Sequence, residues 1–173
     1  MRHAKSDWSE ANLADHDRPL NARGLRDAPA MARWISESGF LPDCILCSSA
    51  KRTQQTAELM LSYWNHTGCE TPTLLIKPEL YLAGADRIFS TVRHSCGASG
   101  EDCANVSRAV LVLGHNPGIS HAASMLSGDA VGLPTAAVAV LRCEAADWSM
   151  PLDFENSRRV AEMRPKSLDR DIH

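Results

Sequence analysis

The 173-residue sequence lacks three features that would place it in other classes of protein. It has no basic excess, because 18 Lys and Arg against 21 Asp and Glu give a net charge of -3, whereas a nucleic-acid-binding protein needs cations to neutralise phosphates. It has no apolar run long enough to span a membrane. It also lacks the basic, apolar and small-residue pattern of a signal peptide. We therefore expect a cytoplasmic protein with no nucleic-acid and no membrane partner.

The composition is that of an ordinary globular protein. Hydrophobic residues make up 44% and charged residues 23% of the chain, and the length suits one domain over residues 1–173. Six cysteines could suggest a disulfide scaffold, but the chain is rich enough in core residues not to need one, so we expect reduced thiols. Cys44 and Cys47 form a C-x-x-C pair without a second pair to complete a zinc site. We expect no metal and no other cofactor.

Helical and strand-like segments alternate along the chain. Apolar residues at helical spacing, with capping residues such as Ser49 and Asn116 before them, predict helices over residues 24–38, 50–64, 85–94 and 117–126. Short apolar runs predict strands over residues 43–47, 73–76, 109–113, 136–142 and 158–163, and the segment 96–105 reads as a loop. This alternation predicts an α/β fold, a three-layer sandwich with a mainly parallel central sheet flanked by helices.

Three polar loops should meet at one edge of this sheet, because sites in open α/β sheets form where strands end and helices begin. They are RHAKSDW (2–8), SSAKRTQQTA (48–57) and GHNPG (114–118). Together they contribute Arg2, His3, Arg52 and His115, and two of them also contribute helix N-termini with unpaired N–H groups. Two arginines, two histidines and two helix starts predict a pocket for a dianion, most plausibly a phosphoryl group.

These loops, together with HDRPLNARG (16–24) and the terminal RPKSL (164–168), resemble the histidine phosphatase superfamily in order and spacing. Within it they are similar to the small phosphohistidine phosphatase branch typified by SixA, which has the phosphoglycerate-mutase-like fold. The resemblance runs over nearly the whole chain. It implies that His3 is the nucleophile and that Arg2, Arg52 and His115 bind and polarise the phosphoryl group.

The same resemblance implies substrate-binding roles for Asn21 and Gly24, and we add Asn116, which is also expected to cap a helix. Larger relatives supply a glutamate as general acid from the region that corresponds to PELYLAGAD (78–86). Glu79 is the only glutamate there and is the candidate for this role. The small branch tends to lack the acid, and a weak or absent acid favours P–N over P–O substrates, because imidazole accepts a proton more readily than an alkoxide does.

The chemistry is consistent with that assignment. Neutral imidazole, with a pKa of about 6.5, is a good nucleophile near pH 7, and attack on phosphorus would leave a phosphohistidine that water later cleaves. Guanidinium groups and a second, protonated histidine would stabilise the transition state without a metal. We expect a phosphatase for phosphohistidine, or a related phosphoramidate, on a phosphorylated protein. The alternatives are a phosphomonoesterase for a small phosphorylated metabolite and a truncated, non-catalytic phosphate-binding relative.

One departure from the family concerns the start of the chain. Members of the family begin with an apolar strand directly before the Arg-His pair, and this strand is missing before Arg2. We therefore expect His3 to hang from a mobile end, with low activity or stability as a result. Two explanations stay open: Met1 is an internal methionine of a longer chain, or the chain is a weak or inactive relative.

Overall fold

Strands and helices alternate along residues 1–96 and 108–168, which are the residues that the computed structural model describes. The predicted α/β class is confirmed, and most element ends lie within two residues of the predicted ones. The elements in chain order are η1 (Asp15–Asp17), α1 (Ala22–Glu37), β1 (Cys44–Ser48), α2 (Lys51–His66), β2 (Thr73–Lys77), η2 (Pro78–Leu80), α3 (Ala85–Cys96), β3 (Val110–Leu113), α4 (Gly118–Ser127), β4 (Val138–Cys143), β5 (Ser157–Met163) and α5 (Pro165–Leu168).

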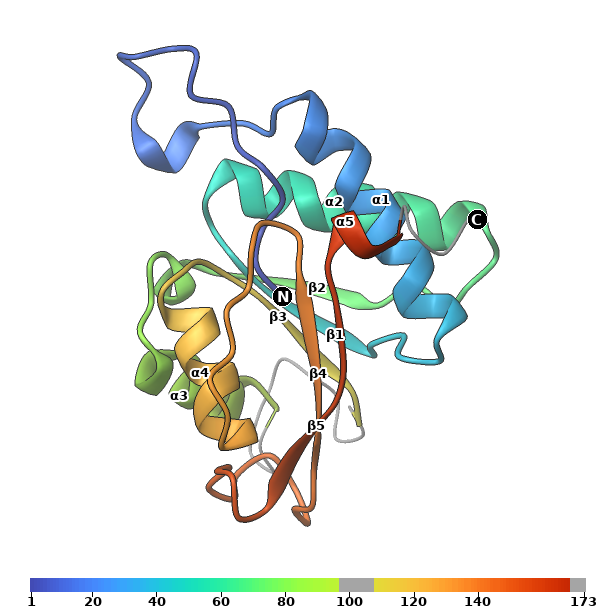
Figure 1. Cartoon of the computed structure of the whole chain (residues 1–173), viewed down its shortest axis with the longest axis vertical. Helices are drawn as coiled ribbons and strands as arrows, with labels where there is room; N and C mark the ends of the chain where they lie inside the picture. The colour runs from blue at the N-terminus through green and yellow to red at the C-terminus, as the bar shows by residue number, and fades with distance from the viewer. Residues whose placement is uncertain (97–107, 169–173) are drawn as a thin grey trace.

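A three-stranded parallel sheet in the order β2-β1-β3 forms the centre of the molecule. Helices α1 and α2 cover one of its faces, and α3 and α4 cover the other (Figure 1). The central strand β1 is buried along its whole length. Because side chains alternate across a strand, Ile45 packs with α1 and α2, whereas Leu46 packs with α3 and α4. The central strand β1 thus packs against both helical layers.

The last two strands pair with each other in an antiparallel sheet, with Val138 opposite Met163 and Cys143 opposite Ser157. They follow one another without an intervening helix, so the chain reverses direction and cannot add parallel strands at this point. The sheet prediction therefore holds for β1 to β3, and β4 and β5 form a separate ladder. No helix within the described ranges has the length and apolar character needed to cross a membrane.

The first residues of the chain are tied into the fold between these two sheets. Arg2 donates its backbone N–H to the Ala137 carbonyl at 3.0 Å, and His3 donates its own to the Gly114 carbonyl at 3.1 Å. The backbone N–H of Ala136 in turn donates to the His3 carbonyl at 3.0 Å. Arg2 makes a parallel bridge with Gly114, and no strand precedes β1 in the part of the chain that is described. The expectation of a mobile His3 is wrong, because its backbone is hydrogen-bonded on both sides.

Two predicted helix caps differ from the structure. Ser49 is not the N-cap of α2; Ala50 takes that place, and the Ser49 hydroxyl bonds the side chain of His16 instead. Asn116 is not the N-cap of α4, because the helix begins one residue later than predicted and Pro117 precedes it. In both cases a side chain suited to capping makes a tertiary hydrogen bond, which local sequence rules do not foresee. The predicted loop 96–105 lies almost wholly outside the described residues.

Candidate functional site

Four side chains from the three predicted loops meet at the carboxyl edge of the parallel sheet. The ring centroids of His3 and His115 lie 5.1 Å apart. Arg52, in the first turn of α2, donates to Nδ1 of His115 at 3.3 Å. His3, Arg52 and His115 are buried, and Arg2 is half-buried beside them. The structure thus brings together the four side chains that the sequence analysis placed at one sheet edge, and their shared function stays a prediction.

His3 is held in one tautomer by its own segment of backbone. Its Nδ1 lies 2.7 Å from the carbonyl oxygen of Ala4, an acceptor only, so Nδ1 carries the hydrogen and Nε2 has the free lone pair. The N–H of Ala4 donates in turn to the Thr56 hydroxyl on α2 at 3.1 Å. Burial, reinforced by the charges of Arg52 and Arg2, lowers the pKa of His3 to about 4. The ring is therefore neutral near pH 7.

His115 is oriented by Ser48, the last residue of β1. Its Nε2 lies 2.8 Å from the Ser48 hydroxyl. Since Arg52 can only donate to Nδ1, the hydrogen of the neutral ring is on Nε2 and is donated to Ser48. Burial, His3 and Arg52 lower the pKa of His115 to about 3. Burial and neighbouring cations thus keep the ring neutral in the ligand-free protein, and its protonated form in the transition state stays a prediction.

Asp15 and Tyr81 belong to the same cluster, and neither is among the site residues predicted from the sequence. Arg52 donates to both the backbone carbonyl and the carboxylate of Asp15, the latter at 2.9 Å. The Tyr81 hydroxyl donates to the same carboxylate oxygen at 2.7 Å. Partial burial acts to raise the pKa of Asp15, but the hydrogen bonds from Tyr81 and Arg52 outweigh it and the pKa is lowered. Asp15 is thus an ionised residue that fixes the Arg52 guanidinium.

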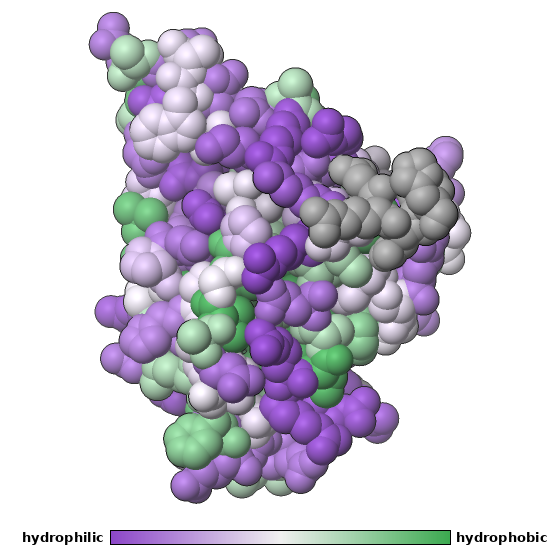
Figure 2. All heavy atoms as spheres, in the orientation of Figure 1, coloured by the Kyte–Doolittle hydropathy of each residue, from purple (hydrophilic) through white to green (hydrophobic). Residues whose placement is uncertain are grey.

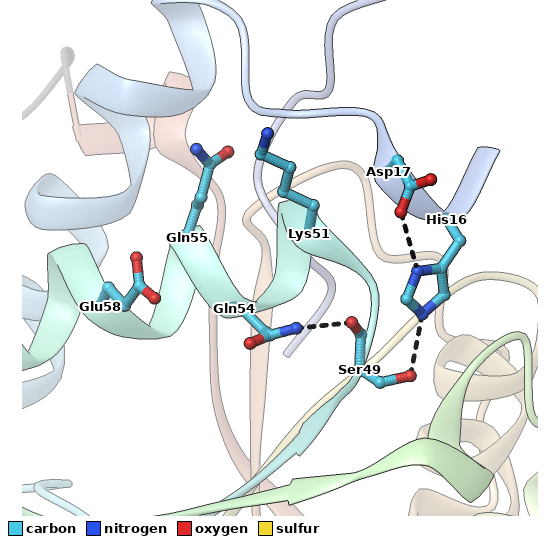
Figure 3. A pocket seen from close by; sticks show the side chains of 7 residues that line it. All are labelled: His16, Asp17, Ser49, Lys51, Gln54, Gln55 and Glu58. Atoms are coloured by element: carbon cyan, nitrogen blue, oxygen red, sulfur yellow. Dashed lines mark hydrogen bonds and ion pairs between the residues drawn. The ribbon is translucent and has the colours of Figure 1, made fainter. Parts of the chain in front are cut away.

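The short helix η1, which carries Asp15, is fastened to the start of α2. His16 bonds the Ser49 hydroxyl through Nε2 at 3.0 Å and approaches Asp17 through Nδ1 at 3.4 Å (Figure 3). Beside these residues a cavity of about 250 Å³ opens along the first turns of α2, with Lys51 and Glu58 on its walls. The contact holds η1 against α2, so it keeps Asp15 in reach of Arg52.

Asn21 and Gly24 support the His3 loop from outside the cluster. The Asn21 side chain accepts from the Gly24 N–H at 3.0 Å and caps α1. A Cβ on Gly24 would lie 2.3 Å from the carbonyl oxygen of Lys5, so only glycine allows α1 to approach the loop this closely. The structure gives both residues a supporting role, and their predicted contact with substrate stays a prediction.

Asn116 lies at the edge of the cluster, and Glu79 lies outside it. The Asn116 amide donates to the Leu133 carbonyl at 2.9 Å, and the Arg2 guanidinium donates to that same oxygen at 3.1 Å. Glu79 is exposed in η2 and makes no hydrogen bond or ion pair with the four clustered residues. Two positions later, Tyr81 reaches the cluster instead. The geometry therefore does not place Glu79 where a general acid would act.

The residues of the cluster do not form a metal site. Across residues 1–96 and 108–168, no group of three or more His, Cys, Asp or Glu side chains is arranged to hold a metal ion. What the arrangement offers instead is a lone pair on His3 Nε2, a buried guanidinium on Arg52 and a second one on Arg2. These groups suit nucleophilic attack on an anionic centre. The expected independence of metal stays a prediction.

Comparison with known proteins gives consistent matches. The model of the histidine phosphatase superfamily (branch 1) matches residues 1–75. The chain is 34% identical over 149 residues to an uncharacterized chloroplastic protein of Arabidopsis thaliana, covering 86% of this chain and 66% of that protein. It is also 34% identical over 160 residues to an uncharacterized protein of Mycobacterium tuberculosis, covering 86% of this chain and 90% of that one.

Solved structures extend the likeness to the fold. A protein from Nakamurella multipartitia, assigned as phosphohistidine phosphatase SixA, is 27% identical with a TM-score of 0.74, covering 95% of this chain and 93% of its own. Another SixA structure, complexed with tungstate, gives a TM-score of 0.71 at 20% identity over 97% of this chain and 96% of that chain. Mycobacterial glucosyl-3-phosphoglycerate phosphatase is more distant, with a TM-score of 0.59 at 19% identity over 91% and 92% of the two chains.

Proposed function

Because the chain belongs to the histidine phosphatase superfamily, we propose that it is a metal-independent phosphatase for phosphohistidine, or a related phosphoramidate, and that it acts through a phosphohistidine intermediate on His3. One observation carries the proposal. The rings of His3 and His115 lie 5.1 Å apart beside the buried Arg52 guanidinium, at the end of the parallel sheet. The substrate would be a phosphorylated protein that presents its phosphohistidine at this edge.

The first step is attack of His3 Nε2 on phosphorus. Nδ1 keeps its hydrogen on the Ala4 carbonyl, so the lone pair of Nε2 is available. The Nε2–P bond forms as the P–N bond of the substrate breaks, and the leaving nitrogen takes up a proton. Charge on the three equatorial oxygens is stabilised by Arg52 and Arg2, which need no reorganisation because contacts with Asp15 and Leu133 already hold them.

The second step is hydrolysis of the intermediate. Water attacks phosphorus, loses a proton as the Nε2–P bond breaks, and leaves inorganic phosphate and neutral His3. His115 contributes through Nδ1, the ring nitrogen that faces Arg52, whereas its Nε2 stays on Ser48. A dianion beside this ring opposes the effects that lower its pKa and favours the protonated, donating form. His115 thus binds the phosphoryl group most strongly when that group is a dianion.

The preference for P–N substrates follows from the acids available. Asp15 is the carboxyl group of the cluster, and its lowered pKa leaves it ionised at neutral pH. Glu79 is exposed and away from His3 and His115. An alkoxide leaving group needs a proton from an acid, whereas a leaving imidazole accepts one readily from water. The cluster therefore suits phosphohistidine better than a sugar phosphate.

A phosphomonoesterase for a small metabolite is the second candidate. The fold is shared with glucosyl-3-phosphoglycerate phosphatase, and the Tyr81 hydroxyl brings a proton into the cluster. For such a substrate Tyr81 is the group we would expect to protonate the leaving oxygen. A preference for a phosphosugar that disappears in Tyr81→Phe would support this candidate.

The deciding experiment is a substrate panel with and without EDTA. We expect turnover of phosphoramidate and of a phosphohistidine peptide to exceed that of sugar phosphates, and EDTA to leave the rates unchanged. A phosphosugar as best substrate would replace the first candidate with the second, and loss of activity in EDTA would contradict metal independence. No turnover of any substrate, together with retained phosphate binding, would indicate a non-catalytic relative.

A further inference from the structure

A second cavity, of about 450 Å³, is lined in part by Arg2, and we call it the basic pocket. Its charged walls come from three segments, namely the first residues of the chain, the start of α1, and the junction between β5 and α5. The face that carries β5 and α5 is mostly hydrophilic (Figure 2). The cationic residues that line the basic pocket are Arg2, Lys5, Arg23, Arg164 and Lys166.

Among residues 1–96 and 108–168, no carboxylate lines this pocket, although the chain as a whole carries a net charge of -3. Two of the five cations have partners nearby, since Arg23 pairs with Asp27 at 3.1 Å and Arg164 with Glu162 at 2.7 Å. Lys5 and Lys166 have no ion pair within the part of the chain that the structure describes. Like charges gathered in a concave site repel one another and attract an anion.

Arg2 connects the basic pocket with the His3 site. One of its terminal nitrogens donates to the Leu133 carbonyl at 3.1 Å, and its buried Nε has no hydrogen-bond partner. A buried N–H of this kind is costly unless a ligand or water accepts from it. Its charge is also among the causes that lower the pKa values of His3 and His115. The Arg2 guanidinium therefore acts on the phosphoryl site while it lines the basic pocket.

We propose that the basic pocket binds a second anionic group, phosphate or carboxylate, of the same substrate whose phosphoryl group reaches His3. The inference rests on the proposed function and adds to it that the substrate is polyanionic close to its scissile bond. Two sources supply this chemistry. One is an acidic side chain beside the phosphohistidine of a protein, and the other is a second phosphate or carboxylate on a small molecule.

Charge reversal at the two unpaired lysines tests the pocket without touching the cluster. Lys5→Glu and Lys166→Glu are compared with Arg158→Glu, which makes the same change of charge at an exposed position of β5 outside the pocket. The substrates are phosphoramidate, two phosphohistidine peptides with acidic or with neutral flanks, and a bisphosphorylated against a monophosphorylated sugar. KM and kcat are measured for each.

In the wild-type protein we expect one polyanionic substrate, the acidic peptide or the bisphosphate, to have a KM roughly tenfold below its neutral or monophosphorylated counterpart. The lysine variants should lose this preference with kcat unchanged, and phosphoramidate turnover should be the same in all four proteins. The preferred pair identifies the source of the anion. No preference in the wild-type protein, or equal loss in Arg158→Glu, would overturn the proposal.

A binding measurement separates this proposal from the proposed function. Titration calorimetry with tripolyphosphate and with inorganic phosphate should give a dissociation constant roughly tenfold lower for tripolyphosphate, because it can reach both sites. Lys5→Glu and Lys166→Glu should abolish that difference, whereas Arg158→Glu should keep it. If phosphoramidate is not hydrolysed but this difference is present, the proposed function fails and the pocket stands. Equal affinities for tripolyphosphate and inorganic phosphate would contradict the proposed role of the basic pocket but not the proposed function.

Discussion

The imidazole rings of His3 and His115 lie 5.1 Å apart between centroids and are tilted by 53°. Each ring has one nitrogen fixed by the fold, His3 by the Ala4 carbonyl and His115 by the Ser48 hydroxyl. The remaining nitrogens are Nε2 of His3 and Nδ1 of His115, of which the second faces Arg52. This division leaves a free lone pair on Nε2 of His3, and it leaves Nδ1 of His115 as the nitrogen that we propose is protonated when an anion binds.

Replacement of the nucleophile should abolish turnover. In His3→Ala the lone pair that attacks phosphorus is lost, so we expect no phosphoramidate hydrolysis and an unchanged circular dichroism spectrum. Rapid acid-free quenching of the wild-type protein should trap base-stable, acid-labile phosphate on His3. His121→Ala, at an exposed position of α4, is the matched control and should keep full activity. Full activity in His3→Ala would rule out the mechanism.

Removal of the buried guanidinium should slow the reaction without unfolding the protein. Arg52→Ala takes away a donor that Asp15 and His115 hold in place, and lost preorganised donors typically cost about 2–4 kcal/mol in transition-state stabilisation. The measurement is kcat/KM for phosphoramidate, with Lys51→Ala as the neighbouring exposed control. Arg52→Lys should recover little, because a point charge does not reproduce the planar fork. A loss of less than about twofold in Arg52→Ala would remove Arg52 from the site.

The candidate acid should matter little for P–N cleavage. Glu79 is exposed in η2, so Glu79→Gln should leave kcat for phosphoramidate and for a phosphohistidine peptide near the wild-type values. The same variant is tested on a sugar phosphate, where an acid would be needed. If Glu79→Gln abolishes P–N cleavage, the reaction uses an acid that the geometry does not reveal, and the assignment to the small branch fails.

The sequence is sufficient to predict the parts of this site that depend on strand ends. Arg52 and His115 follow β1 and β3, which are adjacent parallel strands, so their loops necessarily meet at one edge. Periodicity likewise predicts α1 and α2 to within about two residues. These inferences succeed because each depends on local pattern and one topological rule.

Other parts of the site depend on tertiary contacts that no local pattern encodes. Asp15 lies in a polar stretch that reads as solvated, and its role follows from a hydrogen bond made by Tyr81, 66 positions away. The position of Asp15 directly before the stretch HDRPLNARG (16–24) does not by itself mark it as a site residue. His3 was expected to be mobile because no strand precedes it, yet backbone bonds to Gly114 and Ala136 fix it. Such contacts become visible only when the layers are assembled.

The close approach of α1 to the His3 loop can be tested at Gly24. In Gly24→Ala the new Cβ would lie 2.3 Å from the Lys5 carbonyl oxygen, which is backbone and can move only with the loop. Overpacking of this kind typically costs about 1–3 kcal/mol, so we expect a lower melting temperature. Because Lys5 is two residues from His3, we also expect a lower kcat. Gly84→Ala is the control, since its Cβ would meet no atom within 4 Å. An unchanged melting temperature with a raised KM would favour the substrate-binding role instead.

The two buried histidines should make the stability of the protein fall as pH falls. The pKa is lowered to about 4 for His3 and to about 3 for His115, whereas both are about 6.5 in an unfolded chain. Below about pH 6.5 the unfolded state therefore binds more protons than the folded state, so their contribution is complete above that pH and is lost progressively toward the folded pKa values. The expected loss in the free energy of unfolding is at most about 1.4 kcal/mol per pH unit for each histidine.

Urea unfolding at about pH 7 and about pH 5 measures this dependence. The free energy of unfolding should fall steeply with pH in the wild-type protein, less steeply in His3→Gln and in His115→Gln, and with the wild-type slope in His121→Gln. Equal slopes in all four proteins would mean that neither ring is held neutral by the fold.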